Sequence, residues 1–164
     1  MTLFVGLLLI STLLCTLVTG FVFTYAVIVM PGLSKLGDRE FIRAFQVTDE
    51  IIQNNQPIFM VVWVGSIISV MGTIVTAFIA HDGGANWLVI ATGVVYLLGV
   101  QGVTISIHLP LNRQIQCVKT DEMDPKFLHE QRTLFEARWT HFNKIRTAIA
   151  CVVSASFMFA LSMN

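Results

Sequence analysis

Charge is scarce in this sequence, and that scarcity excludes several classes of protein. Asp, Glu, Lys and Arg make up 12% of the 164 residues, whereas they account for about 25% of an ordinary soluble domain. A composition so poor in charge excludes a disordered chain, a nucleic-acid-binding protein and an ordinary soluble enzyme. Ten basic residues balance ten acidic ones, so no net charge favours a partner of opposite sign.

The sequence also lacks the motifs of common metal and phosphate sites. It has no HExxH or ExxH spacing and no glycine-rich phosphate loop. Its three cysteines form no CxxC pair, and we expect Cys15 and Cys151, which fall in apolar stretches, to be small buried residues. We therefore predict neither a metal site nor a bound cofactor. A metal or haem carrier that uses His108 and His141 stays open as a third alternative.

Four stretches of the chain contain no Asp, Glu, Lys or Arg, and each is long enough to cross most or all of a bilayer. They are Thr2–Ser34, Ile51–His81, Gly83–Asn112 and Thr147–Asn164, with 33, 31, 30 and 18 residues. About 20 apolar residues in a helix span the hydrocarbon core, and the backbone must be helical there because lipid offers no hydrogen-bond partners. We therefore predict one all-α domain, a four-helix transmembrane bundle. The spans are expected at residues 3–30, 57–80, 87–109 and 143–163.

The basic residues predict how this bundle is oriented. All ten lie in the connections between spans one and two and between spans three and four, or at the start of span four. Because Lys-rich and Arg-rich loops stay in the cytoplasm, we expect both long connections inside and both termini outside. The first span has no basic segment before it and no cleavage pattern after it, so we expect it to be retained. The expected location is the bacterial inner membrane.

Small residues predict close packing between the spans. Gly65, Ser69, Thr73 and Ala77 recur every four residues in span two, and small side chains let helices approach closely in a membrane. The sequence Asp82-Gly83-Gly84 is a turn signal. We therefore expect spans two and three to form a tight antiparallel hairpin.

Both long connections carry the pattern of an amphipathic helix on the cytoplasmic side. In the first, Asp38 is placed to cap a helix that runs toward Asn55. In the second, Asp124-Pro125 is the pattern of an N-cap followed by proline at the first helical position. From Pro125 the helix is expected to continue into span four.

Polar stripes on three segments are predicted to meet at the cytoplasmic end of the bundle. One stripe lies on the first connection, a second on span three (Gln101, His108 and Asn112), and a third on the last helix, where Arg132 and Glu136 are spaced to pair. Polar groups inside a membrane are costly and mark functional candidates. The stripes therefore predict a pocket built from Gln46, Asp49, His108, Asn112, Trp139, Asn143 and Arg146. The same spacing is equally compatible with a structural hydrogen-bond network, in which Arg146 extends to the membrane surface.

A set of short motifs runs along the chain from the first span to the last. They are Gly20, Pro31–Leu33, Phe41–Gln46, Asn54–Pro57, His108–Asn112, and Arg138 and Trp139 with Asn143 and Arg146. Together they resemble the signature of the anthrone oxygenase-like membrane proteins, over nearly the whole chain. The most specific parts are the Pro-Leu-Asn element and the set of Trp139, Asn143 and Arg146. The resemblance implies a four-helix membrane protein that oxygenates a polycyclic anthrone to an anthraquinone without a recognised metal or flavin.

The chemistry that the resemblance implies gives roles to the predicted site residues. An anthrone methylene is acidic, so a base removes its proton, dioxygen adds to the anion, and loss of water leaves the quinone. We expect His108 to be the base because imidazole titrates near neutrality, with Asp49 as the alternative. Arg146 is expected to hold the anionic oxygen together with Asn112 and Asn143. The other expected substrate-binding residues are Phe45 and Trp139, which would flank the ring, and Gln46 and Asn55.

The sequence thus supports two main hypotheses. The first is a membrane oxygenase or a related redox enzyme that acts on a hydrophobic, enolisable compound from the lipid phase. The second is a non-catalytic module, either a small-molecule binder or a subunit of a larger membrane complex. The expected partners are the bilayer, a hydrophobic small molecule and, in either case, a second copy of the chain or other subunits; no nucleic acid is expected.

Overall fold

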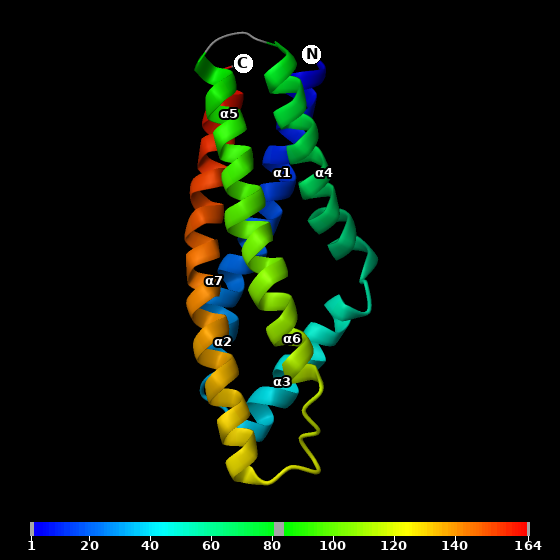
Figure 1. Cartoon of the computed structure of the whole chain (residues 1–164), viewed down its shortest axis with the longest axis vertical. Coiled ribbons are helices and arrows are strands. Elements are labelled where there is room, and N and C mark those ends of the chain that lie inside the picture. The colour runs from blue at the N-terminus through cyan, green and yellow to red at the C-terminus, as the bar shows by residue number, and fades with distance from the viewer. Residues whose placement is uncertain (1, 81–83, 164) are drawn as a thin grey trace.

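The structure, a computed structural model, describes residues 2–80 and 84–163. Every element in these ranges is helical, which confirms the all-α prediction (Figure 1). The elements are α1 (Leu3–Thr24), η1 (Tyr25–Val29), α2 (Met30–Leu33), α3 (Asp38–Gln53), α4 (Pro57–Ala80), α5 (Gly84–Val95), η2 (Tyr96–Gly102), η3 (Thr104–His108), α6 (Leu109–Gln116) and α7 (Pro125–Ser162). The three η elements are short stretches of π-helix within longer helices.

Four continuous helical stretches are long and apolar enough to cross a membrane. They are Leu3–Leu33, Pro57–Ile79, Trp87–Gln116 and Pro125–Ser162. Their outward faces carry large apolar side chains, such as Ile58, which is 73% exposed, and Leu98, which is 70% exposed. Lipid solvates such a surface and water does not, so the protein is an integral membrane protein, as predicted. Cys15 is buried as expected, whereas Cys151 is exposed, so its predicted burial is wrong.

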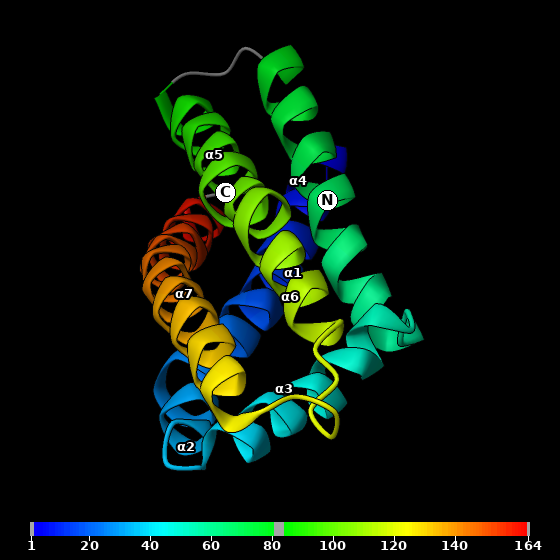
Figure 2. The same cartoon turned by 60° about the horizontal axis from the view of Figure 1, so that its bottom comes forward.

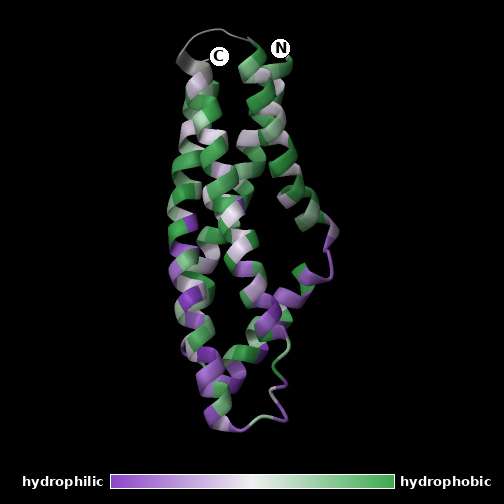
Figure 3. Ribbon diagram, viewed as in Figure 1, coloured by the Kyte–Doolittle hydropathy of each residue, from purple (hydrophilic) through white to green (hydrophobic). Residues whose placement is uncertain are grey.

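The four long helices form a bundle with a polar layer at one end. α1 packs against α4 and α7, and α5 packs against the same two helices. Both termini lie at one end of the bundle, and α3 crosses it at the other end (Figures 1 and 2). Hydrophilic residues concentrate where α3 lies, and we call this the polar end (Figure 3). The predicted Asp82-Gly83-Gly84 turn falls mainly on residues outside the described ranges.

Small residues bring neighbouring helices together, as predicted. Ser69 and Thr73 are buried on α4, and the hydroxyls of Ser11 and Thr73 form a 2.9 Å hydrogen bond between α1 and α4. Gly93 has the same function between α5 and α4, because a Cβ atom there would lie 2.8 Å from Cγ1 of Ile74. Close approach in this membrane bundle therefore depends on side chains that are small or absent.

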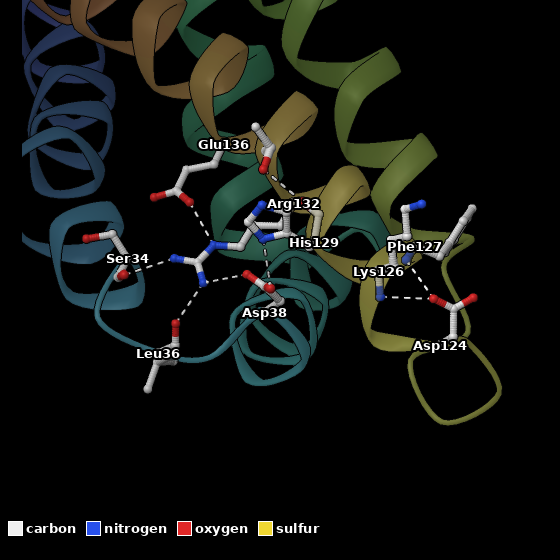
Figure 4. Close-up of polar contacts among 10 residues, drawn as sticks. Ser34, Leu36, Asp38, Asp124, Lys126, Phe127, His129, Arg132 and Glu136 are labelled. Carbon is white, nitrogen blue, oxygen red and sulfur yellow. Dashed lines mark hydrogen bonds and ion pairs between the residues drawn. The ribbon is translucent and has the colours of Figure 1, made fainter.

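Arg132 joins the long helix α7 to the connection before α3 (Figure 4). Its Nη1 donates to the carbonyl oxygen of Leu36 at 2.7 Å and to the carboxylate of Asp38 at 3.0 Å. Its Nη2 donates to the carbonyl oxygen of Ser34 at 2.9 Å, and its Nε donates to the carboxylate of Glu136 at 2.8 Å, the predicted pair. Asp38 is the first residue of α3 and not its N-cap. The predicted cap is therefore wrong, because the carboxylate of Asp38 binds α7 instead.

The predicted start of the last helix is confirmed. The carboxylate of Asp124 accepts hydrogen bonds from the backbone N–H groups of Lys126 and Phe127 at 2.9 and 3.0 Å. Pro125 occupies the first turn, where its missing N–H costs nothing. α7 then continues to Ser162, so one helix carries residues from the polar end to the opposite end of the bundle.

Two of the π-helical stretches, η1 and η3, lie beside residues whose backbone groups have an additional partner or lack a donor. The carbonyl of Val22, just before η1, accepts hydrogen bonds at 3.2 Å from Nδ2 of Asn143 and from Oγ1 of Thr147 on α7. Pro110, just after η3, has no N–H to donate. A π-helical turn changes the face on which the following side chains lie, and such turns are frequent at functional sites.

Candidate functional site

A cavity of about 340 Å³ lies between the helices toward the polar end. Segments far apart in the sequence meet around it, and its wall is mostly apolar and aromatic with a few polar groups. It is lined by Phe21, Tyr25, Phe45, Asp49, Ile52, Gln53, Asn55, Phe59, Met60, Trp63, Ile67, Gln101, Thr104, Ile105, His108, Leu109, Asn112, Arg113, Trp139 and Arg146. This size and composition are typical of a site for a small molecule.

Arg146 places a positive charge in the wall of the cavity. Its side chain is 3% exposed. Its Nε donates to Oδ1 of Asn143 and its Nη1 to Oγ1 of Thr104, each at 2.9 Å, and neither acceptor is charged. Among the described residues Arg146 forms no ion pair. The alternative in which Arg146 extends to the membrane surface is therefore wrong, and the buried cation needs another explanation because it is costly.

Asp49 lines another part of the cavity and is held by amide side chains. Its carboxylate accepts hydrogen bonds from Nδ2 of Asn112 at 2.7 Å and from Nε2 of Gln53 and of Gln116, each at 3.1 Å. Asp49 is 2% exposed. Three donors occupy most of the lone-pair positions of a carboxylate, so the group is fixed between α3 and α6.

The indole of Trp139 connects these groups. Its Nε1 donates to Oδ1 of Asn112 at 2.9 Å, so Asp49, Asn112 and Trp139 form one chain of hydrogen bonds across three helices. The indole lies edge-on to the imidazole of His108, with 5.1 Å between the ring centroids. The guanidinium carbon of Arg146 lies 5.6 Å from the centroid of the indole. Trp139 is therefore a buried wall of the cavity, and not an interfacial tryptophan.

His108 has one ring nitrogen without a partner. The residue is 2% exposed, and its Nδ1 lies 3.4 Å from the carbonyl oxygen of Val103. Its Nε2 is buried and has no hydrogen-bond partner in the described part of the chain. If the proton is on Nδ1, where this carbonyl accepts it, Nε2 carries the lone pair. The imidazole thus has a nitrogen able to accept a proton.

A chain of hydroxyl groups fixes the orientation of the Gln101 amide. Ser66 donates its hydroxyl proton to the carbonyl of Trp63 at 2.7 Å, so its oxygen accepts from the hydroxyl of Tyr96 at 2.6 Å. The Tyr96 oxygen then accepts from Nε2 of Gln101 at 2.8 Å. Oε1 of Gln101 is left buried, with no partner among residues 2–80 and 84–163. A buried acceptor without a donor is costly, and both Gln101 and His108 line the cavity.

Most of the predicted site residues line the cavity, whereas Gln46 and Asn143 do not. Those in its wall are Phe45, Asp49, Asn55, His108, Asn112, Trp139 and Arg146. Gln46 instead donates to the carbonyl oxygens of Ile115 and Val118, each at 2.8 Å, which ties α3 to the end of α6. Asn143 lies behind Arg146 and orients it. Neither side chain is in position to contact a ligand directly.

His141 does not approach His108. It is exposed on α7, lies edge-on to Phe142 at a centroid distance of 5.2 Å, and is absent from the wall of the cavity. The pair that would hold a metal or haem therefore does not converge. Among the described residues, no three His, Cys, Asp or Glu side chains are grouped closely enough to hold a metal ion.

The structure adds cavity residues that the sequence analysis left out. Tyr25 begins η1 and lines the cavity beside Trp139, with 5.6 Å between the ring centroids. Phe59 and Trp63 of α4 stack with 5.3 Å between the ring centroids and also line the cavity. One signal was available for Tyr25: the chain has only two tyrosines, both within apolar spans, where a phenol needs a polar neighbour.

A profile of the family described as Anthrone oxygenase matches residues 58–156, which is more than half of the chain. The match runs from the first turn of α4 into the last part of α7. His108, Trp139 and Arg146 lie within it, whereas Asp49 lies before it. No curated protein and no solved structure matches the chain. The extent of the profile match, together with the four-helix membrane fold, shows that the chain belongs to the anthrone oxygenase family.

Proposed function

We propose that this protein is a membrane oxygenase that uses dioxygen to oxidise a hydrophobic, enolisable compound of the anthrone type. The observation that carries the proposal is the buried guanidinium of Arg146 in the wall of an aromatic cavity, where it forms no ion pair with any described residue. A fixed cation in a dry site stabilises an anion, and an anthrone becomes an anion when its methylene group loses a proton. Membership of the family supports this type of reaction.

The reaction balances with the substrate and dioxygen alone. Loss of a proton from the CH₂ carbon gives an enolate whose charge lies largely on the ketone oxygen. Electron transfer from this carbon to dioxygen and formation of a C–O bond, with uptake of a proton, give a hydroperoxide. The second C–H proton is then lost, the O–O bond breaks, and water leaves. CH₂ and O₂ thus become C=O and H₂O, and the substrate supplies all four electrons.

The cavity residues support a division of roles in this sequence. His108 is assigned as the base, because its Nε2 has no hydrogen-bond partner among the described residues. Arg146 is assigned to bind the enolate oxygen. Its Nε and Nη1 donate hydrogen bonds to Asn143 and Thr104, and its Nη2 is the group assigned to donate to the enolate. Trp139 is assigned to the face of the aromatic ring, where it also excludes water.

Asp49 is assigned a positioning role. Its carboxylate is engaged by amide donors, and through Asn112 it orients the indole of Trp139. The polar end, where the basic residues gather, is proposed to face the cytoplasm. The cavity would then lie in the inner leaflet of the membrane.

The proposal is tested by oxygenation of anthrone in lipid nanodiscs, measured as oxygen uptake and anthraquinone absorbance above the protein-free rate. Arg146→Met is expected to lower kcat about 100-fold or more, because the enolate loses its charged partner. Arg138→Met is the matched control, since Arg138 is exposed on the same helix and outside the cavity. A wild-type rate equal to the protein-free rate, or an Arg146→Met variant with full activity, would contradict the proposal.

A further inference from the structure

We propose that the cavity opens sideways into the membrane through a portal between α4 and the η3–α6 segment. The portal is defined by Met60 on α4, Ile105 on η3 and Leu109 on α6, all of which line the cavity. The compound that passes through the portal is planar, apolar and dissolved in the lipid. The identity of that compound rests on the proposed function, whereas the portal is testable without it.

The two sides of the portal belong to helices whose main packing partners lie elsewhere. α4 packs against α1, α5 and η2, whereas η3 and α6 pack against each other and against α7. In the view of Figure 1 the part of α4 nearer the polar end leans away from α6. The cavity wall includes Met60 and Ile67 from one side and Ile105 and Leu109 from the other. The cavity therefore extends into the space between these helices.

Exposed residues in the wall mark where the cavity meets the outside. Ile105 is 61% exposed although it lines the cavity, and its neighbours Thr104 and His108 are buried. Asn55 and Arg113 are likewise both exposed and part of the wall. A side chain that borders a cavity and is open to the exterior lies at the mouth of that cavity, so these three residues outline the opening.

The surface around the mouth is one that lipid covers. Beside it on α4, Ile58 is 73% and Val61 is 69% exposed, and Leu98, two turns above Ile105, is 70% exposed. Arg113 lies two turns from Ile105 in the opposite direction and forms no ion pair within the described ranges. An arginine there reaches the headgroup region. The mouth thus begins at the interface and continues to the depth of the acyl chains.

The order of side chains along this route fits an apolar compound that arrives from lipid. Asn55 and Arg113 border the mouth at its polar-end side, whereas Met60, Ile105 and Leu109 make its apolar part, which a planar ring system passes without losing hydrogen bonds. Gln101, whose Oε1 has no partner among the described residues, and the guanidinium of Arg146 are buried in the wall. A ligand that dissolves in the leaflet therefore meets apolar contacts first and polar recognition afterwards.

The test measures access to the cavity with a reactive probe that needs no catalysis. The background is Cys117→Ser with Cys151→Ser, since both cysteines are exposed whereas Cys15 is buried. Ile67→Cys then adds a thiol on the wall, and N-phenylmaleimide, which partitions into lipid, labels it in nanodiscs. Ile105→Trp is expected to slow labelling about tenfold or more, because it narrows the mouth.

Two further variants keep the test decisive. Leu98→Trp adds the same ring to the same lipid-facing span outside the cavity, and is expected to leave the labelling rate within about twofold. Ile105→Ala widens the mouth and is expected to label at least as fast as the parent. The portal is refuted if Ile105→Trp has no effect, if Leu98→Trp slows labelling equally, or if Ile105→Ala slows it.

A charged, water-soluble maleimide distinguishes a lipid route from an aqueous one. It is expected to label the Ile67→Cys protein far more slowly than N-phenylmaleimide, and equal rates would overturn the proposal. Because oxygenation is not measured, none of these outcomes depends on anthrone turnover. A protein that labels as expected but does not oxidise anthrone would refute the proposed function and leave the portal intact.

Discussion

His108 and Asp49 are the two groups in the cavity wall able to take a proton from a ligand, and their surroundings differ. Nε2 of His108 has no partner among the described residues, whereas the carboxylate of Asp49 accepts hydrogen bonds from three amide side chains. A carboxylate so engaged orients its neighbours and has little capacity left for a ligand. The two residues that the sequence left as alternatives thus become a base and a positioning residue in our proposal.

Conservative substitutions at these two positions separate the roles. His108→Gln is expected to lower kcat for anthrone oxygenation about 100-fold or more, because the amide keeps the polarity of imidazole but not its basic nitrogen. Asp49→Asn keeps an acceptor for Asn112 and is expected to lose less than about tenfold. Oxygen uptake measures both, and His141→Gln, outside the cavity, is the control. Full activity of His108→Gln combined with an inactive Asp49→Asn would reverse the assignment.

Helical spacing predicted which side chains share a face, but not what those side chains bind. The spacing of Trp139 and Arg146 on one helix places both on one stripe, and both line the cavity. Gln46 has the right spacing too, yet it binds backbone carbonyls of α6 and of the residues after it. Backbone carbonyls can accept side-chain hydrogen bonds where a helix ends, and the spacing of Gln46 does not show which helix end lies beside it. Tyr25 was missed because it belongs to none of the three polar stripes, and its place beside Trp139 of α7 is a tertiary contact.

At the scale of elements, local signals were reliable and tertiary ones were not. The Asp124-Pro125 cap is formed by neighbours in the sequence and was predicted correctly. Asp38 carries the same N-cap signal, but its carboxylate accepts a hydrogen bond from Arg132 of α7, which is distant in the sequence. The choice between capping and a distant ion pair depends on the packing of α7 beside α3, which one sequence does not reveal.

The contacts of Arg132 predict that the polar end depends on this side chain for stability. Arg132→Ala removes charged hydrogen bonds to two carboxylates and two backbone carbonyls, at a site where the arginine side chain is 14% exposed. The expected loss is about 1.5–3 kcal/mol, seen as a lower Tm in detergent and as faster proteolysis of residues 34–38. Arg138→Ala is the exposed control. An unchanged Tm would show that these hydrogen bonds stabilise the folded protein no more than the hydrogen bonds to water that replace them.

Packing between α4 and α5 gives a second stability prediction, in which the space between the helices decides the outcome and charge does not. Gly93→Val places methyl groups where Ile74 and Val70 already lie within 3.2 Å of a Cβ. Overpacking of this kind costs about 1–3 kcal/mol, measured by thermal unfolding in detergent. Gly20→Val is the matched control, because no atom lies within 4 Å of a Cβ there. Equal stability of the two variants would mean that the helices separate without cost.

For the molecule as a whole, the concentration of hydrophilic residues at one end of the bundle links the fold to the proposed chemistry. The two termini lie at the end opposite α3, and α3 and the basic connections lie at the polar end (Figures 1 and 3). The cavity is nearer the polar end, since Asp49 and Gln53 of α3 line it. An oxygenase with this layout would take its substrate from one leaflet only. Which leaflet it is depends on the orientation of the bundle, which the distribution of Lys and Arg predicts.

Cysteine labelling from either side of the membrane tests this orientation. Cys117 is exposed after α6 at the polar end, and Thr2→Cys adds a thiol beside the start of α1 at the other. With Cys151→Ser as background, a membrane-impermeant maleimide is expected to label Cys117 only in inverted vesicles and the Thr2→Cys thiol only in right-side-out ones. The opposite pattern would contradict the predicted topology and would place the portal in the outer leaflet. Since the portal and the buried guanidinium do not depend on orientation, that result would change the source of the substrate and not the chemistry of the cavity.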